Sequence, residues 1–278
     1  MTIQTALLQG VRLLEEDAVA APRLTAEVLL AHALGRDRAY LYGRPEAELR
    51  EVEWLHYGRY LHERLQGKPT QYITQRQEFY GRMFRVTPAV LIPRPETEHV
   101  VETALPFARQ ARRLVDAGAG SGAIAVTLAL ETSRLVLATD ISIAALEVAA
   151  GNAAALCAPV CLVACDLLSA ISSRSVDLVV SNPPYVPDED MAGLQREVRD
   201  YEPHVALAGG RDGLEIYQRL ITDAARVLGP GGRLVVELGF RTAAGVTAML
   251  GGRFEDVRLV EDLAGIPRVL SAARAHGA

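Results

Sequence analysis

The sequence predicts an α/β fold in which a mostly parallel sheet carries helices on both faces, preceded by a small helical domain. Two observations lead to this prediction. After about residue 112, short apolar runs alternate with helical segments, as expected where parallel strands are joined by helices. Before residue 68, apolar residues recur at intervals of three and four, which is typical of helices that bury one face.

The N-terminal segment is expected to contain several short helices, with breaks at Pro22 and Gly35. From Gln71 to Ile92 the composition changes to aromatic and β-branched residues, and Gly81 lies between two short strand-like runs. This stretch therefore has the pattern of a hairpin. We expect three parts: a helical domain over 1–68, a hairpin linker over 69–92 and the α/β domain over 93–278.

Seven apolar runs of strand length are expected to form the sheet. The first five alternate with helices, so we expect them to be parallel. The last two are separated only by 261–267, which is too short for a crossover helix, so we expect one antiparallel strand at that end of the sheet. The runs lie at 114–115, 135–138, 160–164, 178–180, 234–238, 257–260 and 268–271.

Composition narrows the class of protein. The chain of 278 residues is 50% hydrophobic and carries a formal net charge of -5. Proteins that bind nucleic acid usually present a basic face, so no stable binding to DNA or RNA is expected. The N-terminus lacks a basic start followed by an uninterrupted apolar stretch, and no run of about 18 apolar residues occurs. We therefore expect a cytoplasmic monomer without a signal peptide or membrane contact.

The three cysteines do not have the spacing of a metal cluster. Cys161 and Cys165 lie along one expected strand, where four residues separate them by roughly 13 Å. The histidines are scattered singly. We therefore expect reduced cysteines and no metal.

The first expected strand leads into a glycine-rich turn and a helix. Glycines at the carboxyl end of a strand let a ligand approach the backbone closely. The second strand ends at Asp140, which can accept hydrogen bonds from both hydroxyls of a ribose. The third ends at Asp166 and Leu167, which suit an adenine ring, although Asp166 also suits a helix N-cap. NAD and S-adenosylmethionine both fit, at a site that includes Gly118, Ala119, Gly120, Ser121 and Gly122.

The fourth strand ends in Asn182, Pro183, Pro184 and Tyr185. The prolines stop the strand and hold Asn182 extended. An amide or aromatic amine nitrogen accepts a methyl group poorly because its lone pair is delocalised. The Asn182 oxygen and the Pro183 carbonyl can each accept one substrate N–H, which leaves the lone pair aimed at a sulfonium methyl group. We expect Asn182, Pro183 and Tyr185 to be catalytic and all four to bind substrate, with Tyr185 stacked on the planar group. A plain turn is the alternative.

Taken together, these motifs resemble the release factor glutamine methyltransferases. Asp116 to Gly122 is similar to the Asp-x-Gly-x-Gly-x-Gly signature of class I methyltransferases, with Ala117 and Ala119 at positions where larger residues often occur. The stretches 91–98, 182–185 and 201–203 extend the resemblance over nearly the whole chain. It implies a Rossmann-like class I methyltransferase domain that binds S-adenosylmethionine, with Asn182 also beside it, and releases S-adenosylhomocysteine.

The resemblance also implies the substrate, which is the glutamine of the Gly-Gly-Gln motif in class 1 peptide chain release factors. Residues 1–68 would recognise this partner, and Arg94 and Glu98 would border the pocket. Asn-Pro-Pro-Tyr is shared with adenine-N6 DNA and guanine-N2 ribosomal RNA methyltransferases, so these remain alternatives, as does a non-catalytic nucleotide-binding adapter. Residues 206–212 are expected to form either a mobile lid or an ordinary surface loop.

Overall fold

The computed structural model describes residues 1–276, which form two compact units. Unit 1 comprises Met1–Arg76 together with Gln195–Tyr201, and unit 2 comprises Gln77–Leu194 together with the chain from Glu202 onward. The second segment of unit 1 interrupts unit 2 in sequence, so the chain passes from one unit to the other three times. The domain boundaries expected at residues 68 and 92 stay a prediction, and they did not include this return of the chain.

Unit 1 is built from helices, and the longer ones, α1, α2 and α4, each bury several residues. Thr2 caps the first helix, because its hydroxyl accepts a hydrogen bond from Thr5 N at 3.2 Å. A side chain at Gly10 would collide with Tyr57, whose ring is fully buried against that backbone. The helices are α1 (Ile3–Glu16), α2 (Pro22–Leu34), α3 (Arg38–Gly43), α4 (Glu51–Leu65), α5 (Thr70–Thr74) and α9 (Arg196–Tyr201).

The short helix α9 completes unit 1. Glu197 of α9 accepts a hydrogen bond at 2.6 Å from Arg64 of α4, whose side chain is only 10% exposed. The Tyr201 hydroxyl donates to Gln66 O at 3.0 Å. A largely buried guanidinium requires a charged partner, so unit 1 depends on this distant segment to neutralise Arg64.

Unit 2 contains a seven-stranded sheet with the strand order β5-β4-β3-β6-β7-β9-β8. The first five strands in that order are parallel, whereas β9 is antiparallel to both β7 and β8. This confirms the predicted α/β fold and its antiparallel final strand. The strands are β3 (Leu114–Ala117), β4 (Val136–Asp140), β5 (Val160–Ala164), β6 (Val176–Ser181), β7 (Leu228–Glu237), β8 (Phe254–Glu261) and β9 (Pro267–Arg274).

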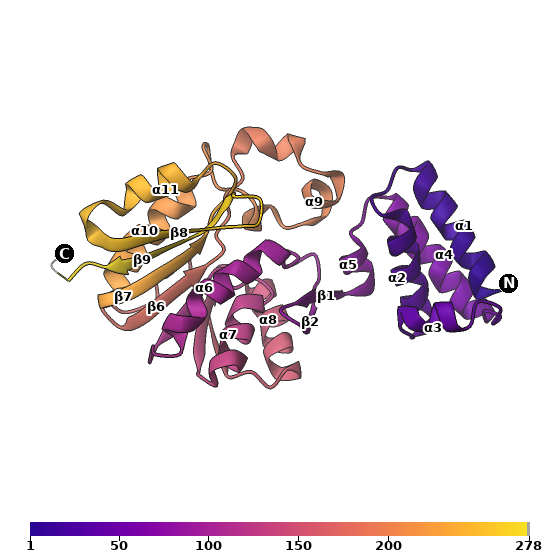
Figure 1. Ribbon diagram of the computed structural model, residues 1–278, viewed down its shortest axis with the longest axis horizontal. Helices are drawn as coiled ribbons and strands as arrows, with labels where there is room; N and C mark the ends of the chain where they lie inside the picture. Colours follow the sequence, from indigo (N-terminus) through magenta and orange to yellow (C-terminus); the bar gives the residue numbers. More distant parts are fainter. Residues whose placement is uncertain (277–278) are drawn as a thin grey trace. The chain divides into compact units, whose positions relative to one another are not determined.

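Helices cover both faces of this sheet (Figure 1). Side chains alternate between the faces along each strand, so Leu178 and Val180 of β6 enter one core and Val179 enters the other. The first core lies under α6 (Glu98–Ala108), α7 (Ala123–Thr132) and α8 (Ile143–Ala155), and the second under α10 (Glu215–Val227) and α11 (Ala243–Leu250). Parallel strands connected in this way bring their carboxyl ends to one edge of the sheet.

Shorter elements flank the sheet. The strands β1 (Arg76–Phe79) and β2 (Arg82–Arg85) form a hairpin, in which the rings of Phe79 and Phe84 meet edge to face with centroids 6.1 Å apart. Both rings belong to the core under α6. The 3-10 helices are η1 (Pro95–Thr97), η2 (Asp188–Gly193), η3 (His204–Ala206) and η4 (Gly251–Arg253).

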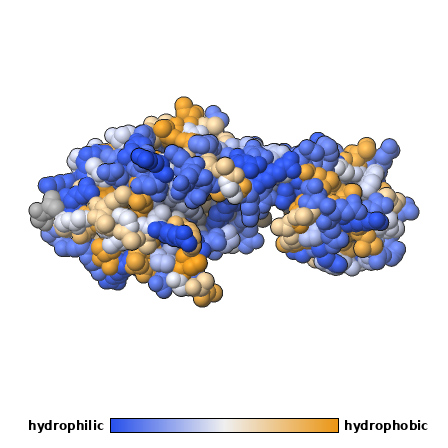
Figure 2. Space-filling view, turned by 90° about the horizontal axis from the view of Figure 1, so that it is seen from above, coloured by the Kyte–Doolittle hydropathy of each residue, from blue (hydrophilic) through white to orange (hydrophobic). Residues whose placement is uncertain are grey.

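The surface carries dispersed hydrophobic residues. On the face drawn in Figure 2, they form small groups separated by hydrophilic residues. Within residues 1–276, every helix is too short or too polar to cross a membrane.

Candidate active site

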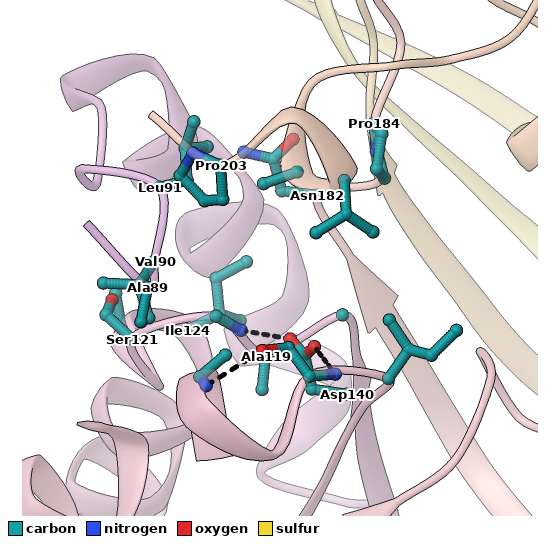
Figure 3. A pocket seen from close by; sticks show the side chains of 18 of the residues that line it. Ala89, Val90, Leu91, Ala119, Ser121, Ile124, Asp140, Asn182, Pro184 and Pro203 are labelled. Carbon is teal, nitrogen blue, oxygen red and sulfur yellow. Dashed lines mark hydrogen bonds between the residues drawn. The ribbon is translucent and has the colours of Figure 1, made fainter. Parts of the chain in front are cut away.

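A cavity of about 200 Å³ lies in unit 2 at the carboxyl ends of β3, β4, β5 and β6. Figure 3 shows Asn182 and Pro184 across this cavity from Asp140. Many of the residues expected from the sequence line it, namely Gly118, Ala119, Gly120, Ser121, Asp140, Asp166, Leu167, Asn182 and Pro184. Segments distant in sequence therefore share one site.

The glycine-rich turn forms one wall of the cavity. Gly118 and Gly120 have φ values of 75° and 53°, which favour glycine. No atom lies within 4 Å of the position that a Cβ would take at either residue. Because both residues lack a side chain, they can adopt these positive φ values, and the space beside their backbone stays open. Gly122 lies outside the cavity wall, and a Cβ there would approach Ala149 of α8 to 3.2 Å, so it serves helix packing.

Asp140 connects the turn to the end of β4. Its Oδ2 accepts a hydrogen bond from Gly120 N at 2.8 Å, and its Oδ1 accepts one from Ser142 N at 2.8 Å (Figure 3). Each oxygen retains a second lone pair. The carboxylate can therefore hold the turn in place and still accept hydrogen bonds from a ligand.

Asp116 is buried beneath the turn. Its Oδ2 accepts a hydrogen bond from Ala125 N at 3.0 Å, whereas its Oδ1 has no hydrogen-bond partner among the described residues. Burial, and to a smaller extent the charge of Asp140, raise the pKa of this carboxyl to about 7. Its position under α7 indicates a structural role, because it does not line the cavity.

Asp116→Asn should reveal this pKa in the pH dependence of stability. The carboxyl titrates near its ordinary value of 3.8 in the unfolded chain and at about 7 in the folded one. Between these values only the folded protein holds the proton, so its free energy of unfolding falls as pH rises, by up to about 1.4 kcal/mol per unit. Asparagine does not titrate. The stability of the wild type relative to the variant, from urea unfolding, should therefore be greater near pH 4 than near pH 8; a constant difference would contradict the assignment.

Asp166 and Leu167 follow β5, the edge strand that lies next to β4 and Asp140. Asp166 is ion-paired with Arg219 of α10, and both side chains are about half exposed and line the cavity. No helix starts after Asp166, so the N-cap interpretation is wrong. Arg219 was not predictable from the sequence, because nothing local marks an arginine on a helix surface as a partner for an acid 53 residues away.

Asn182 follows β6 directly. Ser181 ends the strand and anchors it by donating its hydroxyl hydrogen bond to Ala117 O at 2.7 Å. The Asn182 amide nitrogen donates to Thr97 Oγ1 at 3.1 Å. Because the nitrogen is engaged with the protein, the amide oxygen is the atom left to accept a hydrogen bond from a ligand.

Pro183 and Tyr185 lie beside the cavity but do not line it. The Tyr185 ring packs against Gly239, where a Cβ would come within 2.6 Å of the ring. Its hydroxyl donates a long hydrogen bond of 3.5 Å to Glu237 Oε1. Burial raises the pKa of this phenol, so it is neutral at physiological pH.

Arg94 and Glu98 do not line the cavity either. Arg94 forms a 2.5 Å ion pair with Glu202, whose side chain is buried, and so joins the 91–98 stretch to the 201–203 stretch. Pro203, next to Glu202, does line the cavity. Glu98 accepts a hydrogen bond from Tyr80 N at 2.7 Å and thereby holds the β1–β2 hairpin. Both residues support the site from behind its wall.

Two further residues of the site, Thr97 and Glu237, were not predicted from the sequence. Thr97 lines the cavity and accepts the hydrogen bond from Asn182. Glu237 ends β7, is 2% exposed, and has its pKa raised to about 7 by burial. The sequence does carry one signal for Glu237, because it is a single acidic residue directly after the apolar run 234–236 of this strand.

The 206–212 segment is tied to the chain that follows Asn182. Val186 N donates to Leu207 O at 2.9 Å, and Gly209 N donates to Val186 O at 2.8 Å. A Cβ at Gly209 would lie 2.7 Å from the Tyr185 backbone. Close packing and paired backbone groups describe an ordered loop rather than a free flap.

Within residues 1–276, no three His, Cys, Asp or Glu side chains gather as metal ligands.

The sequence is similar to known families along most of its length. Residues 5–74 match the PrmC N-terminal domain, and residues 97–197 match the methyltransferase small domain. A release factor glutamine methyltransferase from Koribacter versatilis is 46% identical over 97% of this chain and 98% of its own length. Another from Moorella thermoacetica is 42% identical over 99% of both chains.

Solved structures share the fold at lower identity. A methyltransferase from Pyrococcus furiosus superposes with a TM-score of 0.53 at 18% identity, over 71% of this chain and 91% of its own. The 16S rRNA N2 G1207 methyltransferase of Thermus thermophilus, solved with AdoMet and guanosine, has a TM-score of 0.52 at 19% identity and covers 72% of this chain and 49% of its own. At such identities the likeness concerns the fold alone.

Proposed function

The chain belongs to the release factor glutamine methyltransferases, and from this membership we propose that it methylates class 1 peptide chain release factors, supporting translation termination. The methyl group would pass from the sulfonium sulfur of S-adenosylmethionine, leaving S-adenosylhomocysteine, to the side-chain amide nitrogen of the glutamine in their Gly-Gly-Gln motif, and this nitrogen would release one proton to solvent. The observation that carries the proposal is that Asn182 and Asp140 line one cavity, across from each other, with the Asn182 oxygen free for a substrate (Figure 3).

We propose that this cavity holds S-adenosylmethionine. The open space beside Gly118 and Gly120 admits a ligand close to the backbone. Asp140 would accept the ribose hydroxyls, while Asp166 and Leu167 would contact the adenine. When bound, the cofactor supplies an electrophilic methyl group on a sulfonium sulfur.

The residues after β6 would orient the substrate amide. The Asn182 oxygen and the Pro183 carbonyl would each accept one N–H of the glutamine, so that its lone pair is no longer held in conjugation. Pro184 and Tyr185 would flank the planar group, and the neutral phenol of Tyr185 adds no charge there. Positioning away from water would supply most of the rate enhancement.

Unit 1 would recognise the release factor away from the reacting glutamine. Its match to the PrmC N-terminal domain over residues 5–74 supports this role. Contacts remote from the reacting group add binding energy that a short peptide lacks. A Gly-Gly-Gln peptide should therefore be a much poorer substrate than an intact factor.

The function is tested by incubating the protein with S-adenosylmethionine labelled on its methyl group. The substrates are an unmethylated release factor, the same factor with its motif glutamine changed to alanine, a Gly-Gly-Gln peptide, DNA and ribosomal RNA. We expect label on the intact factor, at most weak label on the peptide and none elsewhere. Label on nucleic acid would retain the chemistry and overturn the substrate, whereas no transfer at all would favour a non-catalytic nucleotide-binding protein.

A further inference from the structure

A buried chain of polar side chains lies behind the candidate catalytic residues. Asn182 donates a hydrogen bond to Thr97 of η1, and Tyr185 donates one to Glu237 at the end of β7. An electrostatic interaction between Thr97 and Glu237 links the two pairs. Thr97 is 4% exposed and Glu237 is 2% exposed. Segments up to 140 residues apart are thus brought together beside the proposed amide site.

The chemistry of these groups sets the direction of each hydrogen bond. The Asn182 amide nitrogen can only donate, so Thr97 Oγ1 is its acceptor, at 3.1 Å. The Thr97 hydroxyl hydrogen is then free to be donated in turn. Glu237 is the buried carboxyl that interacts with Thr97; burial raises its pKa to about 7, and the interactions with Thr97 and Tyr185 partly offset that rise. In its ionised form Glu237 can only accept, so it would take the Thr97 hydroxyl hydrogen and leave Thr97 Oγ1 as an acceptor for Asn182.

This direction matters for methyl transfer. An asparagine amide has an oxygen on one side and a nitrogen on the other, and rotation by half a turn would exchange them. In the flipped state, the Asn182 NH₂ group would meet the NH₂ group of the substrate, and two donors repel. An acceptor behind Asn182 prevents the flip by holding its nitrogen.

We infer that Thr97 and Glu237 are positioning residues, which fix the Asn182 amide with its oxygen toward the substrate. Glu237 acts twice, since it orients the Thr97 hydroxyl and holds the Tyr185 phenol. The inference rests on the proposed function and goes beyond it by assigning a task to residues outside the Asn-Pro-Pro-Tyr stretch.

The cost of burying Glu237 supports a functional role. Its Oε2 has no hydrogen-bond partner among the described residues, and its surroundings contain Glu96 as well as the more favourable Arg268. A partly satisfied buried carboxylate destabilises a fold, and an apolar side chain of similar size would avoid that cost. Such local violations of good packing are characteristic of functional sites.

Thr97→Val tests the inference, because valine has the shape of threonine without the hydroxyl. We expect kcat on the release factor to fall by about 10- to 100-fold, while its KM and the affinity for S-adenosylhomocysteine change by less than about threefold. Thr97→Ser keeps the hydroxyl and should restore kcat to within about threefold of the wild type. Thr127→Val is the matched control, since Thr127 is fully buried in α7 with a hydroxyl that lacks a partner among the described residues.

A second variant separates positioning from folding. Glu237→Met removes the acceptor at similar size, so kcat should fall at least about 10-fold while the urea midpoint does not fall. Unchanged kcat in folded Thr97→Val, or a loss that Thr97→Ser fails to restore, would overturn the inference. A parallel loss of stability and kcat in both Thr97→Val and Glu237→Met would overturn it too. Failure of the proposed function is distinguishable, because the wild type itself would then not methylate the factor.

Discussion

Asn182→Ala should lower kcat for release factor methylation by about 10³-fold, the size of effect seen when a preorganised hydrogen-bonding group is removed from an active site. The Asn182 oxygen is the acceptor that would draw on a substrate N–H, and alanine offers none. Single-turnover transfer of labelled methyl groups measures the loss directly. Affinity for S-adenosylhomocysteine, measured by calorimetry, should change by less than about 10-fold, because Asn182 is only one residue of the cavity wall.

Asn182→Asp is the informative companion variant. Aspartate keeps an oxygen on the substrate side but cannot donate to Thr97, whose hydroxyl would have to reverse direction. Its kcat should therefore lie between those of the wild type and Asn182→Ala. If Asn182→Ala retained more than about a tenth of the wild-type kcat, the assignment of Asn182 as the amide acceptor would be refuted.

Asp140→Ala should weaken binding of S-adenosylhomocysteine by at least about 100-fold, since each hydrogen bond to a charged group contributes about 1.5–3 kcal/mol. Two effects combine. The ribose would lose its acceptor, and Gly120 N and Ser142 N would lose theirs, so the glycine-rich turn would lose its anchor. Calorimetric titration with the product measures the change without requiring turnover.

Asp166→Ala provides the comparison for Asp140. The Asp166 side chain is about half exposed and already ion-paired with Arg219, so its loss should weaken binding by less than about 10-fold. Urea unfolding of both variants shows whether the turn or the whole fold has changed. Equal and small losses in the two variants would mean that the ligand does not lie against Asp140.

The sequence was sufficient for the architecture because strand periodicity is local. Alternating apolar runs and helices identified all seven strands, and the short 261–267 connection predicted the antiparallel pair. The largest difference between a predicted and an observed strand is in β7, which begins at Leu228, whereas the expected run began at residue 234. Residues 229–232 are Gly-Pro-Gly-Gly, which normally marks a turn, but here they lie within the strand, between the buried Leu228 and the buried apolar residues that follow.

The site was predictable only as far as its motifs are contiguous. The glycine turn and Asn182 each follow a strand and Asp140 ends one, so topology alone brings them to one edge. Pairings such as Asn182 with Thr97, or Arg94 with Glu202, join segments 85 and 108 residues apart. They depend on how loops pack over the sheet, which periodicity does not encode.

The return of the chain to unit 1 has a consequence for synthesis. Arg64 lies in the first quarter of the sequence, but its carboxylate partner, Glu197, is made only after β3, β4, β5 and β6. A nascent chain that has just left the ribosome with residues 1–76 therefore lacks Glu197, the carboxylate that pairs with the largely buried Arg64 in the full chain. The N-terminal bundle is the first part to be made but is finished only when residues 195–201 dock on it. Fragments that end before this segment should be loosened around Arg64 and cut by proteases more readily than the same helices in the full chain.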